Sequence, residues 1–344
     1  MPSAHRRVVA PTPRAGAALV LLVALVLAAA VGCAPDDLVS AKAPKATTTT
    51  TTAVPATAAA GTSDDRRLTT PDGRTRTHHV YAASSLRGTG IPARLLVVAL
   101  HGGGGTGQQF ERDTGLDGWA EANGAVVVYP DGTGGGSDGS TFRTWNGGGC
   151  CGVAASQRVD DVEYVRLLIE QLRAEYTIDP GHVVAVGYAN GGMLAYRLAC
   201  ELSASISAIG VQSSTFERET CTPDEPVAVL HIHGTGDRNL PIDGGVGDES
   251  SQDITFNSPR EGIKILASAD VCAPQATETA SVDTPGVVTR RWSPCAGGTS
   301  VAMIEVDTPS HAWMGPSPSN DGGSPEARLD STAVLWQFTA SHAR

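Results

Sequence analysis

Two side chains in the second half of the chain, Asp237 and His311, have the types and spacing that acid–base chemistry needs. Each follows an apolar run, so each is expected on a loop after a buried strand. A carboxylate that accepts a hydrogen bond from one imidazole nitrogen leaves the other nitrogen able to take a proton. The pair therefore predicts a general base, which needs a third group on which to act.

Residues 183–196 have the layout of a nucleophile elbow, in which a buried strand is followed by a sharp turn and a helix. Gly187 and Gly191 flank the turn, and the absence of side chains there lets the backbone bend tightly. A serine is expected at the apex of Gly-x-Ser-x-Gly, but the residue is Ala189. Because a methyl group has no lone pair with which to attack a carbonyl, the pattern predicts a serine-hydrolase frame without its nucleophile.

The order of these residues along the chain is that of an α/β-hydrolase, where an acid and then a histidine follow the nucleophile. Ala189, Asp237 and His311 occupy those three positions. Ser213 and Ser214 follow a different predicted strand and are not expected to replace the missing nucleophile. Action of the acid–base pair on water or on a substrate C–H bond is a weaker alternative. Taken singly, the acid could be a turn residue and the histidine a surface residue.

Four glycines follow His101, directly after a strand predicted over 95–100. Attack on an ester creates an oxyanion that backbone N–H groups stabilise, and side chains would obstruct those groups. We expect one donor from Asn190, next to the apex, and one from Gly103. A flexible loop is the plain alternative. A phosphate-binding loop is disfavoured because no Gly-Lys-Ser/Thr follows.

His231 and His233 alternate along a predicted strand, so their side chains face the same side of it. Metal ligation is one interpretation, and packing at the end of the strand is the one we favour. The cysteine spacing does not match a structural zinc site. We therefore expect no metal.

Charge excludes some partners of the 344-residue chain, whose formal net charge is −11. An acidic surface argues against binding to nucleic acid or to an anionic membrane. Three arginines and an apolar run over 15–31 are typical of an export signal, and the run is short for a spanning helix. Residues 30–33 resemble a bacterial lipobox, which predicts a signal peptide over 1–32 and a lipid anchor on Cys33. Plain secretion is the alternative.

Six cysteines remain after Cys33, and an even number in an exported chain indicates disulfides. Six cysteines allow fifteen pairings. We favour the sequence-local pairs, Cys200 with Cys221 and Cys272 with Cys295. This leaves Cys150 and Cys151 as a vicinal disulfide or a free pair.

Beyond the signal, residues 33–65 are mostly Ala, Thr, Pro and Lys, which predicts a disordered stalk. A single folded domain is expected over 66–344. Strands are predicted over 77–83, 95–100, 125–129, 183–186, 206–211, 227–233, 287–292 and 301–306. Helices are predicted over 116–123, 160–176, 193–200, 259–269 and 329–341. Such alternation predicts an α/β fold with a doubly wound, mostly parallel sheet.

From residue 66 onward the chain resembles the exported poly(3-hydroxybutyrate) depolymerase and feruloyl/acetylxylan esterase group of α/β-hydrolases. The matching motifs lie at 101–105, 129–132, 145–146 with 149–152, 159–162, 187–193, 233–237 and 311–313. The resemblance implies a carboxylesterase without a cofactor, acting on polyester, feruloylated or acetylated polysaccharide, or small acyl esters. It also implies that Trp145, Tyr188 and Trp313 line the acyl or aryl groove, with core packing as the alternative.

The sequence departs from this family at Ala189, where members have serine. We therefore expect an exported esterase scaffold that is inactive as written. The alternative is a lipoprotein that binds esters or acylated glycans without hydrolysing them. Deliberate replacement and natural loss of the serine both fit the sequence. An ester is the expected ligand, and the lipid anchor is the expected contact with a membrane.

Overall fold

The computed structural model describes residues 61–344 except 89, 251–252 and 316–323. The predicted signal peptide, Cys33 and most of the predicted stalk lie outside the described residues. All described residues belong to one compact unit. Strand β1 (Thr62–Thr69) pairs antiparallel with β2 (Thr75–Ala82) along its whole length. The folded domain therefore starts before the boundary predicted at residue 66.

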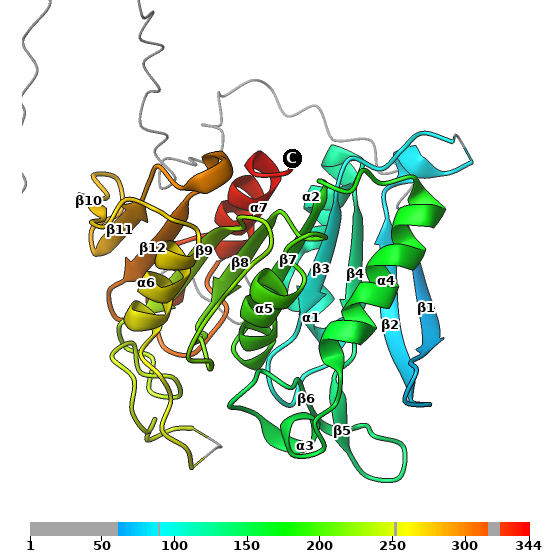
Figure 1. The fold of residues 1–344 in the computed structure, drawn as a ribbon, viewed down its shortest axis with the longest axis horizontal. Helices are drawn as coiled ribbons and strands as arrows, with labels where there is room; N and C mark the ends of the chain where they lie inside the picture. Colours follow the sequence, from blue (N-terminus) through cyan, green and yellow to red (C-terminus); the bar gives the residue numbers. More distant parts are fainter. Residues whose placement is uncertain (1–60, 89, 251–252, 316–323) are drawn as a thin grey trace, which may run out of the picture. The chain divides into compact units, whose positions relative to one another are not determined.

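A ten-stranded sheet forms the centre of this unit, in the order β1-β2-β4-β3-β7-β8-β9-β12-β11-β10 (Figure 1). The six strands in its middle run parallel: β4 (Val126–Pro130), β3 (Leu96–Leu100), β7 (Val183–Tyr188), β8 (Ala208–Gln212), β9 (Ala228–Gly234) and β12 (Val301–Val306). The strands at both edges are antiparallel, including β11 (Val287–Trp292) and β10 (Thr277–Ala280). The predicted mostly parallel sheet is confirmed.

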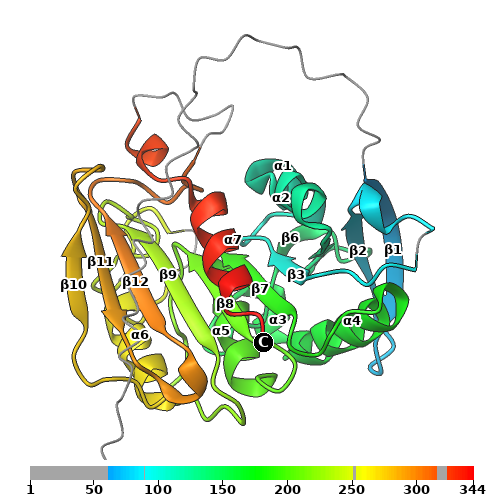
Figure 2. The same cartoon turned by 90° about the horizontal axis from the view of Figure 1, so that it is seen from above.

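Helices cover both faces of the sheet (Figure 2). One face packs against α4 (Asp161–Tyr176), α5 (Asn190–Glu201) and α6 (Pro259–Ala269). The other packs against α1 (Gly107–Thr114), α2 (Leu116–Asn123) and α7 (Ser331–Ser341). Every residue of β3, β4, β8, β9 and β12 is buried, which explains their continuous apolar sequences. This is the architecture of an α/β-hydrolase.

Some elements near the carboxyl ends of the parallel strands were not predicted. Helix α1 has a polar sequence, and its start is fixed by Thr106, whose hydroxyl accepts a hydrogen bond from Gln109 N at 3.1 Å. The short elements β5 (Thr133–Gly135), β6 (Thr141–Thr144) and α3 (Gly152–Ser156) lie below the sheet in Figure 1. They come from a glycine-rich segment for which no strand or helix was predicted.

Three disulfides are present in the described part of the chain. Cys200–Cys221 and Cys272–Cys295 are the two predicted sequence-local pairs. The first ties the end of α5 to the segment before β9, and the second ties the segment after α6 to the segment before β12. The third is the vicinal pair Cys150–Cys151.

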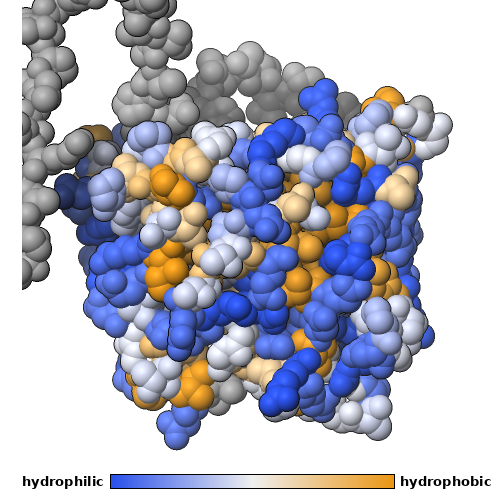
Figure 3. Space-filling view, in the orientation of Figure 1, coloured by the Kyte–Doolittle hydropathy of each residue, from blue (hydrophilic) through white to orange (hydrophobic). Residues whose placement is uncertain are grey.

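The surface over α4, α5 and α6 is mixed, with hydrophilic residues predominating and apolar ones scattered between them (Figure 3). The helices in the described ranges include none with the length and apolar character that crossing a membrane requires.

Candidate active site

Ala189 forms the sharp turn between β7 and α5, with φ 49° and ψ −120°. Such a conformation costs a residue with a Cβ on the order of 1–3 kcal/mol, and it persists only where the surrounding structure offsets that cost. A Cβ on Gly191 would lie 2.2 Å from Leu100 O, and a Cβ on Gly187 would lie 2.6 Å from Gly191 O. The strands and the helix therefore approach too closely for side chains at both glycines. The turn has the geometry of an elbow and carries a methyl group at its apex.

His311 and Asp237 meet beside this turn. The Nδ1 atom of His311 lies 2.8 Å from Asp237 Oδ2. They meet because β9 and β12 are adjacent parallel strands, so the loops that follow them leave the same edge of the sheet. Burial raises the pKa of the Asp237 carboxyl, but the interactions with His311, together with those of His233 and the Leu240 N–H, outweigh burial and hold this pKa below its ordinary value. The ionised carboxylate accepts the Nδ1 proton of His311, which leaves Nε2 to receive another.

One cavity of about 160 Å³ brings together the residues that the sequence singled out: Gly103, Ala189, Asn190 and His311. Asp237 lies behind it, in contact with His311. The sequence analysis did not place the other lining residues in the site: Phe142, Thr144, Cys151, Met193, Asn239, Leu240, Ser250 and Phe256. These residues come from segments far apart in the chain, and only the folded arrangement brings them together.

The two predicted oxyanion donors are neighbours, since a Cβ on Gly103 would lie 3.8 Å from the Cβ of Asn190. The N–H group of Gly104 is engaged, because it donates to Arg143 O at 2.7 Å. Asn190 is the first residue of α5, where a backbone N–H has no intrahelical acceptor. Within the described residues, no backbone hydrogen bond engages the N–H of Gly103 or Asn190. Both groups can therefore act as donors to an oxyanion.

His101 fixes the base of the glycine loop. Its Nδ1 donates to Gly102 O at 2.7 Å, and its Nε2 accepts from Gly132 N at 2.9 Å. Burial lowers the pKa of His101 to about 4, so the ring is neutral at physiological pH and can accept through Nε2. The loop that carries Gly103 is thereby tied to the segment after β4.

Trp145 does not line the cleft, contrary to the expectation from the family resemblance. Its side chain has no exposed surface, and its Nε1 donates to His101 O at 2.9 Å. Trp145 lines neither the cavity that contains Ala189 nor the cavity beside the glycine loop. Trp145 therefore belongs to the core beneath the glycine loop, which was the alternative for these aromatic residues.

Tyr188 and Trp313 lie on the other side of the dyad. The Tyr188 hydroxyl donates to His311 O at 2.9 Å, and its ring centroid lies 5.2 Å from that of His311. Tyr188 also lines a second cavity, whereas Trp313 packs edge-on against Tyr188 and Phe110. The structure thus gives Tyr188 a surface toward a cavity and gives Trp313 a supporting position behind it.

The second cavity, of about 370 Å³, adjoins the glycine loop. It contains polar side chains, among them Gln109 and Asp113, and burial raises the pKa of Asp113. Gly103 and Phe142 line both cavities, and Phe142 is 50% exposed. The apex therefore lies beside a smaller, mainly apolar compartment and near a larger, more polar one.

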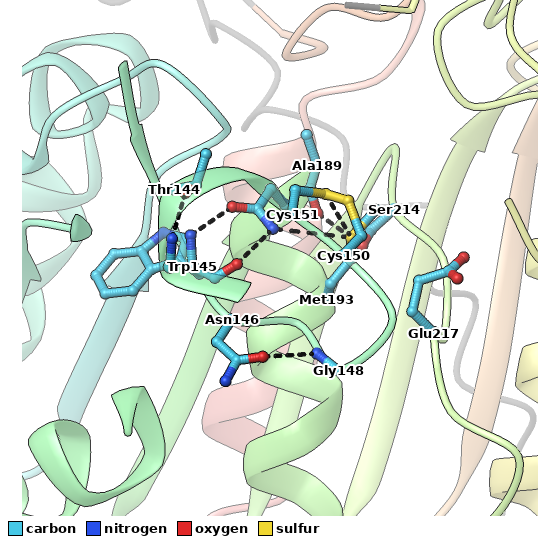
Figure 4. Close-up of a disulfide and its surroundings, with 12 residues drawn as sticks. Thr144, Trp145, Asn146, Gly148, Cys150, Cys151, Ala189, Met193, Ser214 and Glu217 are labelled. Carbon is cyan, nitrogen blue, oxygen red and sulfur yellow. Dashed lines mark hydrogen bonds between the residues drawn. A yellow bond between two sulfur atoms is a disulfide. The ribbon is translucent and has the colours of Figure 1, made fainter. Parts of the chain in front are cut away.

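The vicinal disulfide forms part of the apolar compartment (Figure 4). Cys150 and Cys151 pack in one apolar cluster with Ala189 and Met193, and the sulfur atoms of Cys151 and Met193 are 3.8 Å apart. The sequence analysis left these cysteines as a vicinal disulfide or a free pair. Their adjacency was the available signal for a disulfide, but it did not place that disulfide beside the elbow.

Among the described residues, no group of three His, Cys, Asp or Glu side chains that could hold a metal ion is found around His231 and His233. Both histidines are completely buried on β9. This agrees with packing at the end of a strand, the interpretation favoured from the sequence.

Comparisons with known proteins agree with this geometry. Residues 80–250, which include the elbow, match the family model described as "Esterase PHB depolymerase". The "Putative esterase NocK" of Nocardia uniformis subsp. tsuyamanensis is 29% identical over 266 residues, covering 71% of this chain and 72% of that protein. "Feruloyl esterase B" of Piromyces equi is 26% identical over 230 residues, covering 65% of this chain and 40% of that protein. The chain thus spans less than half of the second relative.

Among solved structures, an S-formylglutathione hydrolase from Agrobacterium tumefaciens aligns with a TM-score of 0.52 and 12% sequence identity. The alignment covers 84% of this chain and 98% of that protein. At this identity the likeness supports the fold alone.

Proposed function

We propose that this chain, which belongs to the esterase PHB depolymerase family, is a carboxylic ester hydrolase scaffold that is inactive as written. The observation that supports this is the cavity in which Gly103, Asn190 and His311 surround Ala189. In this proposal Gly103 and Asn190 are the oxyanion donors and His311, held by Asp237 behind the cavity, is the base, so only the attacking oxygen is missing. The chain with Ala189 is therefore expected to bind an ester without hydrolysing it.

With serine at position 189, the site would carry out acyl transfer in two stages. The ester carbonyl oxygen would accept hydrogen bonds from the N–H groups of Gly103 and Asn190 as negative charge developed on it. His311 Nε2 would take the serine proton as the serine oxygen bonded to the carbonyl carbon, and would pass that proton to the alcohol as the C–O bond broke. Water would then repeat the sequence on the acyl group. With Ala189 the first bond cannot form.

The two compartments suggest how an ester lies in the site. We infer that the acyl group enters the apolar compartment beside Cys151 and Met193, and that the alcohol part extends toward Gln109 and Asp113. An apolar acyl group on a polar alcohol is the composition of an acylated polysaccharide. Polyester and small acyl esters remain in the proposed range. The names of the relatives, a putative esterase and a feruloyl esterase, support an ester ligand.

The test is Ala189→Ser, assayed with p-nitrophenyl acetate and p-nitrophenyl butyrate. Loss of a triad nucleophile costs on the order of 10⁶-fold in kcat, so restoration should raise kcat by several orders of magnitude. His311→Ala in the Ala189→Ser background should remove most of that gain. A folded Ala189→Ser variant that is no more active than the parent chain would contradict the proposal. So would rapid hydrolysis by the parent chain that His311→Ala abolishes.

A second candidate function is capture of an ester or acylated glycan by the unmodified chain. The observation that favours it is the retention of the cleft, the free N–H groups and the Asp237–His311 pair around an apex that cannot react. Calorimetry with a feruloylated oligosaccharide and a hydroxybutyrate oligomer should show saturable binding to the parent chain. Hydrolysis of the same compounds by Ala189→Ser without measurable binding by the parent would count against capture.

We also propose that the chain is exported and held outside the cytoplasm by a lipid on Cys33, from the export signal and lipobox in the sequence. Cys33→Ser should move the protein from the membrane fraction to the medium or the soluble fraction. Mass spectrometry of the mature N-terminus should show diacylated Cys33 in the parent. An unlipidated mature form in the medium would favour plain secretion.

A further inference from the structure

Strand β9 carries two histidines that the proposed acyl-transfer chemistry does not use. His231 and His233 are completely buried, and neither lines the cavity that contains Ala189. Buried imidazoles need hydrogen-bond partners, because each ring carries a donor and an acceptor in its neutral form. With their partners they form a continuous hydrogen-bonded chain that ends at the backbone carbonyl of Leu240, close to the acid of the dyad.

The chain starts on α5, where the Tyr196 hydroxyl is hydrogen-bonded to His231 Nδ1. His231 Nε2 then lies 2.8 Å from His233 Nδ1, and His233 Nε2 lies 2.9 Å from Leu240 O. The two imidazole rings are nearly parallel, at 10°, and the Tyr196 ring lies 13° from that of His231. Three buried side chains are thus linked end to end by hydrogen bonds.

The carbonyl at the end of this chain determines the direction of every bond in it. Leu240 O can only accept, so the proton of His233 is on Nε2. Burial lowers the pKa of both histidines, so each ring is neutral and carries one N–H. His233 Nδ1 must then accept from His231 Nε2–H, and His231 Nδ1 must accept from the Tyr196 hydroxyl. All three donors therefore point from Tyr196 toward Leu240.

Leu240 connects this chain to the acid. The N–H groups of Asn239 and Leu240 donate to Asp237 Oδ1, at 3.0 and 2.8 Å. His233 Nε2 lies 3.6 Å from Asp237 Oδ2, the same oxygen that accepts from His311 Nδ1. His233 therefore binds the Leu240 carbonyl, and the Asn239 and Leu240 N–H groups of the same turn bind the Asp237 carboxylate. Its N–H also presents a positive edge to the oxygen that faces His311.

We propose that His233, supported by His231 and Tyr196, is a positioning residue that fixes the turn of residues 237–240 and thereby directs Asp237 toward His311. This inference rests on the proposed function, because it assigns to His233 an effect on the acid–base pair of the ester site. His233 does not contact the substrate cavity, and it acts through Asp237 and through Leu240, which lines that cavity. A one-directional chain of buried hydrogen bonds suits this role, because its members polarise one another.

The first test needs no substitution. Imidazole ¹⁵N–¹H correlation spectra of the ¹⁵N-labelled parent chain should show His231 and His233 protonated on Nε2 and His311 protonated on Nδ1. Protonation of His233 on Nδ1 would overturn the inference, because the bond to Leu240 O could not then exist. This test is independent of catalysis, so it decides the matter even if Ala189→Ser proves inactive and the proposed function fails.

The second test uses His233→Met and His233→Gln, each in the parent and in Ala189→Ser. Methionine removes the donor to Leu240, whereas the glutamine amide can replace it. His233→Met should leave His311 as a mixture of tautomers instead of one. In the Ala189→Ser background it should also lower kcat on the order of 10- to 100-fold with KM unchanged, since small displacements of a reacting group have effects of this size. His233→Gln should restore most of kcat. His182→Gln, at the amino end of β7, is the control and should leave kcat unchanged.

A folded His233→Met variant with the parent's His311 tautomer and an unchanged kcat would overturn the inference. If His233→Met does not fold, Tyr196→Phe takes its place, because it removes only the hydroxyl at the far end of the chain. Its spectrum should keep His231 protonated on Nε2, because Leu240 O still sets the direction of the chain through His233. Protonation of His231 on Nδ1 in this variant would mean that the carbonyl does not set that direction, and would also overturn the inference.

Discussion

Asn190 and Trp145 are joined by two hydrogen bonds, one at each end of the same side-chain amide. Asn190 Oδ1 accepts from Trp145 N at 2.6 Å, and Nδ2 donates to Trp145 O at 3.0 Å. Both ends of the Asn190 side-chain amide thus hold the segment after β6 against the elbow. The backbone N–H of Asn190 remains for the site. One residue therefore connects the packing of the buried indole to the geometry of the proposed oxyanion donors.

This pairing predicts that Asn190→Asp destabilises the fold. The carboxylate would place an oxygen against Trp145 O and lose one buried hydrogen bond, at a cost of about 2–3 kcal/mol. The favourable effect of an acid at a helix N-terminus, about 0.3–1 kcal/mol, is smaller. Urea unfolding measures the difference. Asn123→Asp is the matched control, because Asn123 Nδ2 also donates to a tryptophan carbonyl, that of Trp119, but is exposed. Equal losses in the two variants would contradict the prediction.

The close approach at the elbow predicts opposite effects for two Gly→Ala substitutions. Gly191→Ala would put a methyl group 2.2 Å from Leu100 O, so we expect a loss above about 3 kcal/mol or failure to fold. Gly118→Ala lies in α2 with no atom within 4 Å of the added Cβ, and should stabilise by about 0.5–1 kcal/mol. Thermal unfolding of both variants is the measurement. A stable Gly191→Ala variant would show that the elbow can relax.

Removal of the vicinal disulfide should affect ligand binding more than stability. The double variant Cys150→Ser, Cys151→Ser replaces apolar sulfur atoms of the compartment with two hydroxyl groups. We expect its affinity for an apolar acyl ester to fall at least about tenfold, which corresponds to roughly 1.4 kcal/mol of binding free energy. The matched control, Cys272→Ser with Cys295→Ser, opens a disulfide that does not line the cavity. It should lose about 3 kcal/mol of stability and keep its affinity. Calorimetry and urea unfolding separate the two outcomes. Unchanged affinity in the first variant would remove the disulfide from the proposed ligand site.

Asp270 predicts a pH dependence of stability. Burial raises the pKa of its carboxyl to about 6, although it accepts hydrogen bonds from Val227 N. Because this pKa is higher in the folded chain than in the unfolded one, protonation favours the folded state. The contribution is complete at low pH and is lost as pH rises from about 4 to about 6, by roughly 2–3 kcal/mol. Asp270→Asn should lack this decline, as measured by urea unfolding at pH 4 and pH 7. Parallel pH profiles of the two proteins would contradict the assignment.

Apolar runs and glycines in the sequence were enough to predict the central strands and the elbow. The buried strands are continuous apolar runs, so their positions in the chain and the mostly parallel sheet could be predicted, and Asp237 and His311 follow the strands that bring them together. The order of the strands in the sheet was not predicted. The segment around β5, β6 and α3 could not be predicted, because its glycine-rich sequence has no periodicity. The place of the vicinal disulfide beside Ala189 depends on how that segment folds back. Trp145 was misplaced for the same reason, since burial under a loop leaves no local pattern.

The backbone of Ala189 has the sharp conformation that directs a side chain into the cleft, although the side chain there is an unreactive methyl group. Alanine codons (GCN) and serine codons (TCN) differ in their first base alone. A single G-to-T transversion in the gene would therefore place a hydroxyl at the apex of a turn that already exists. On the proposed function, the inactive and the active form of this site are separated by one nucleotide change, and neither form requires the site to be rebuilt.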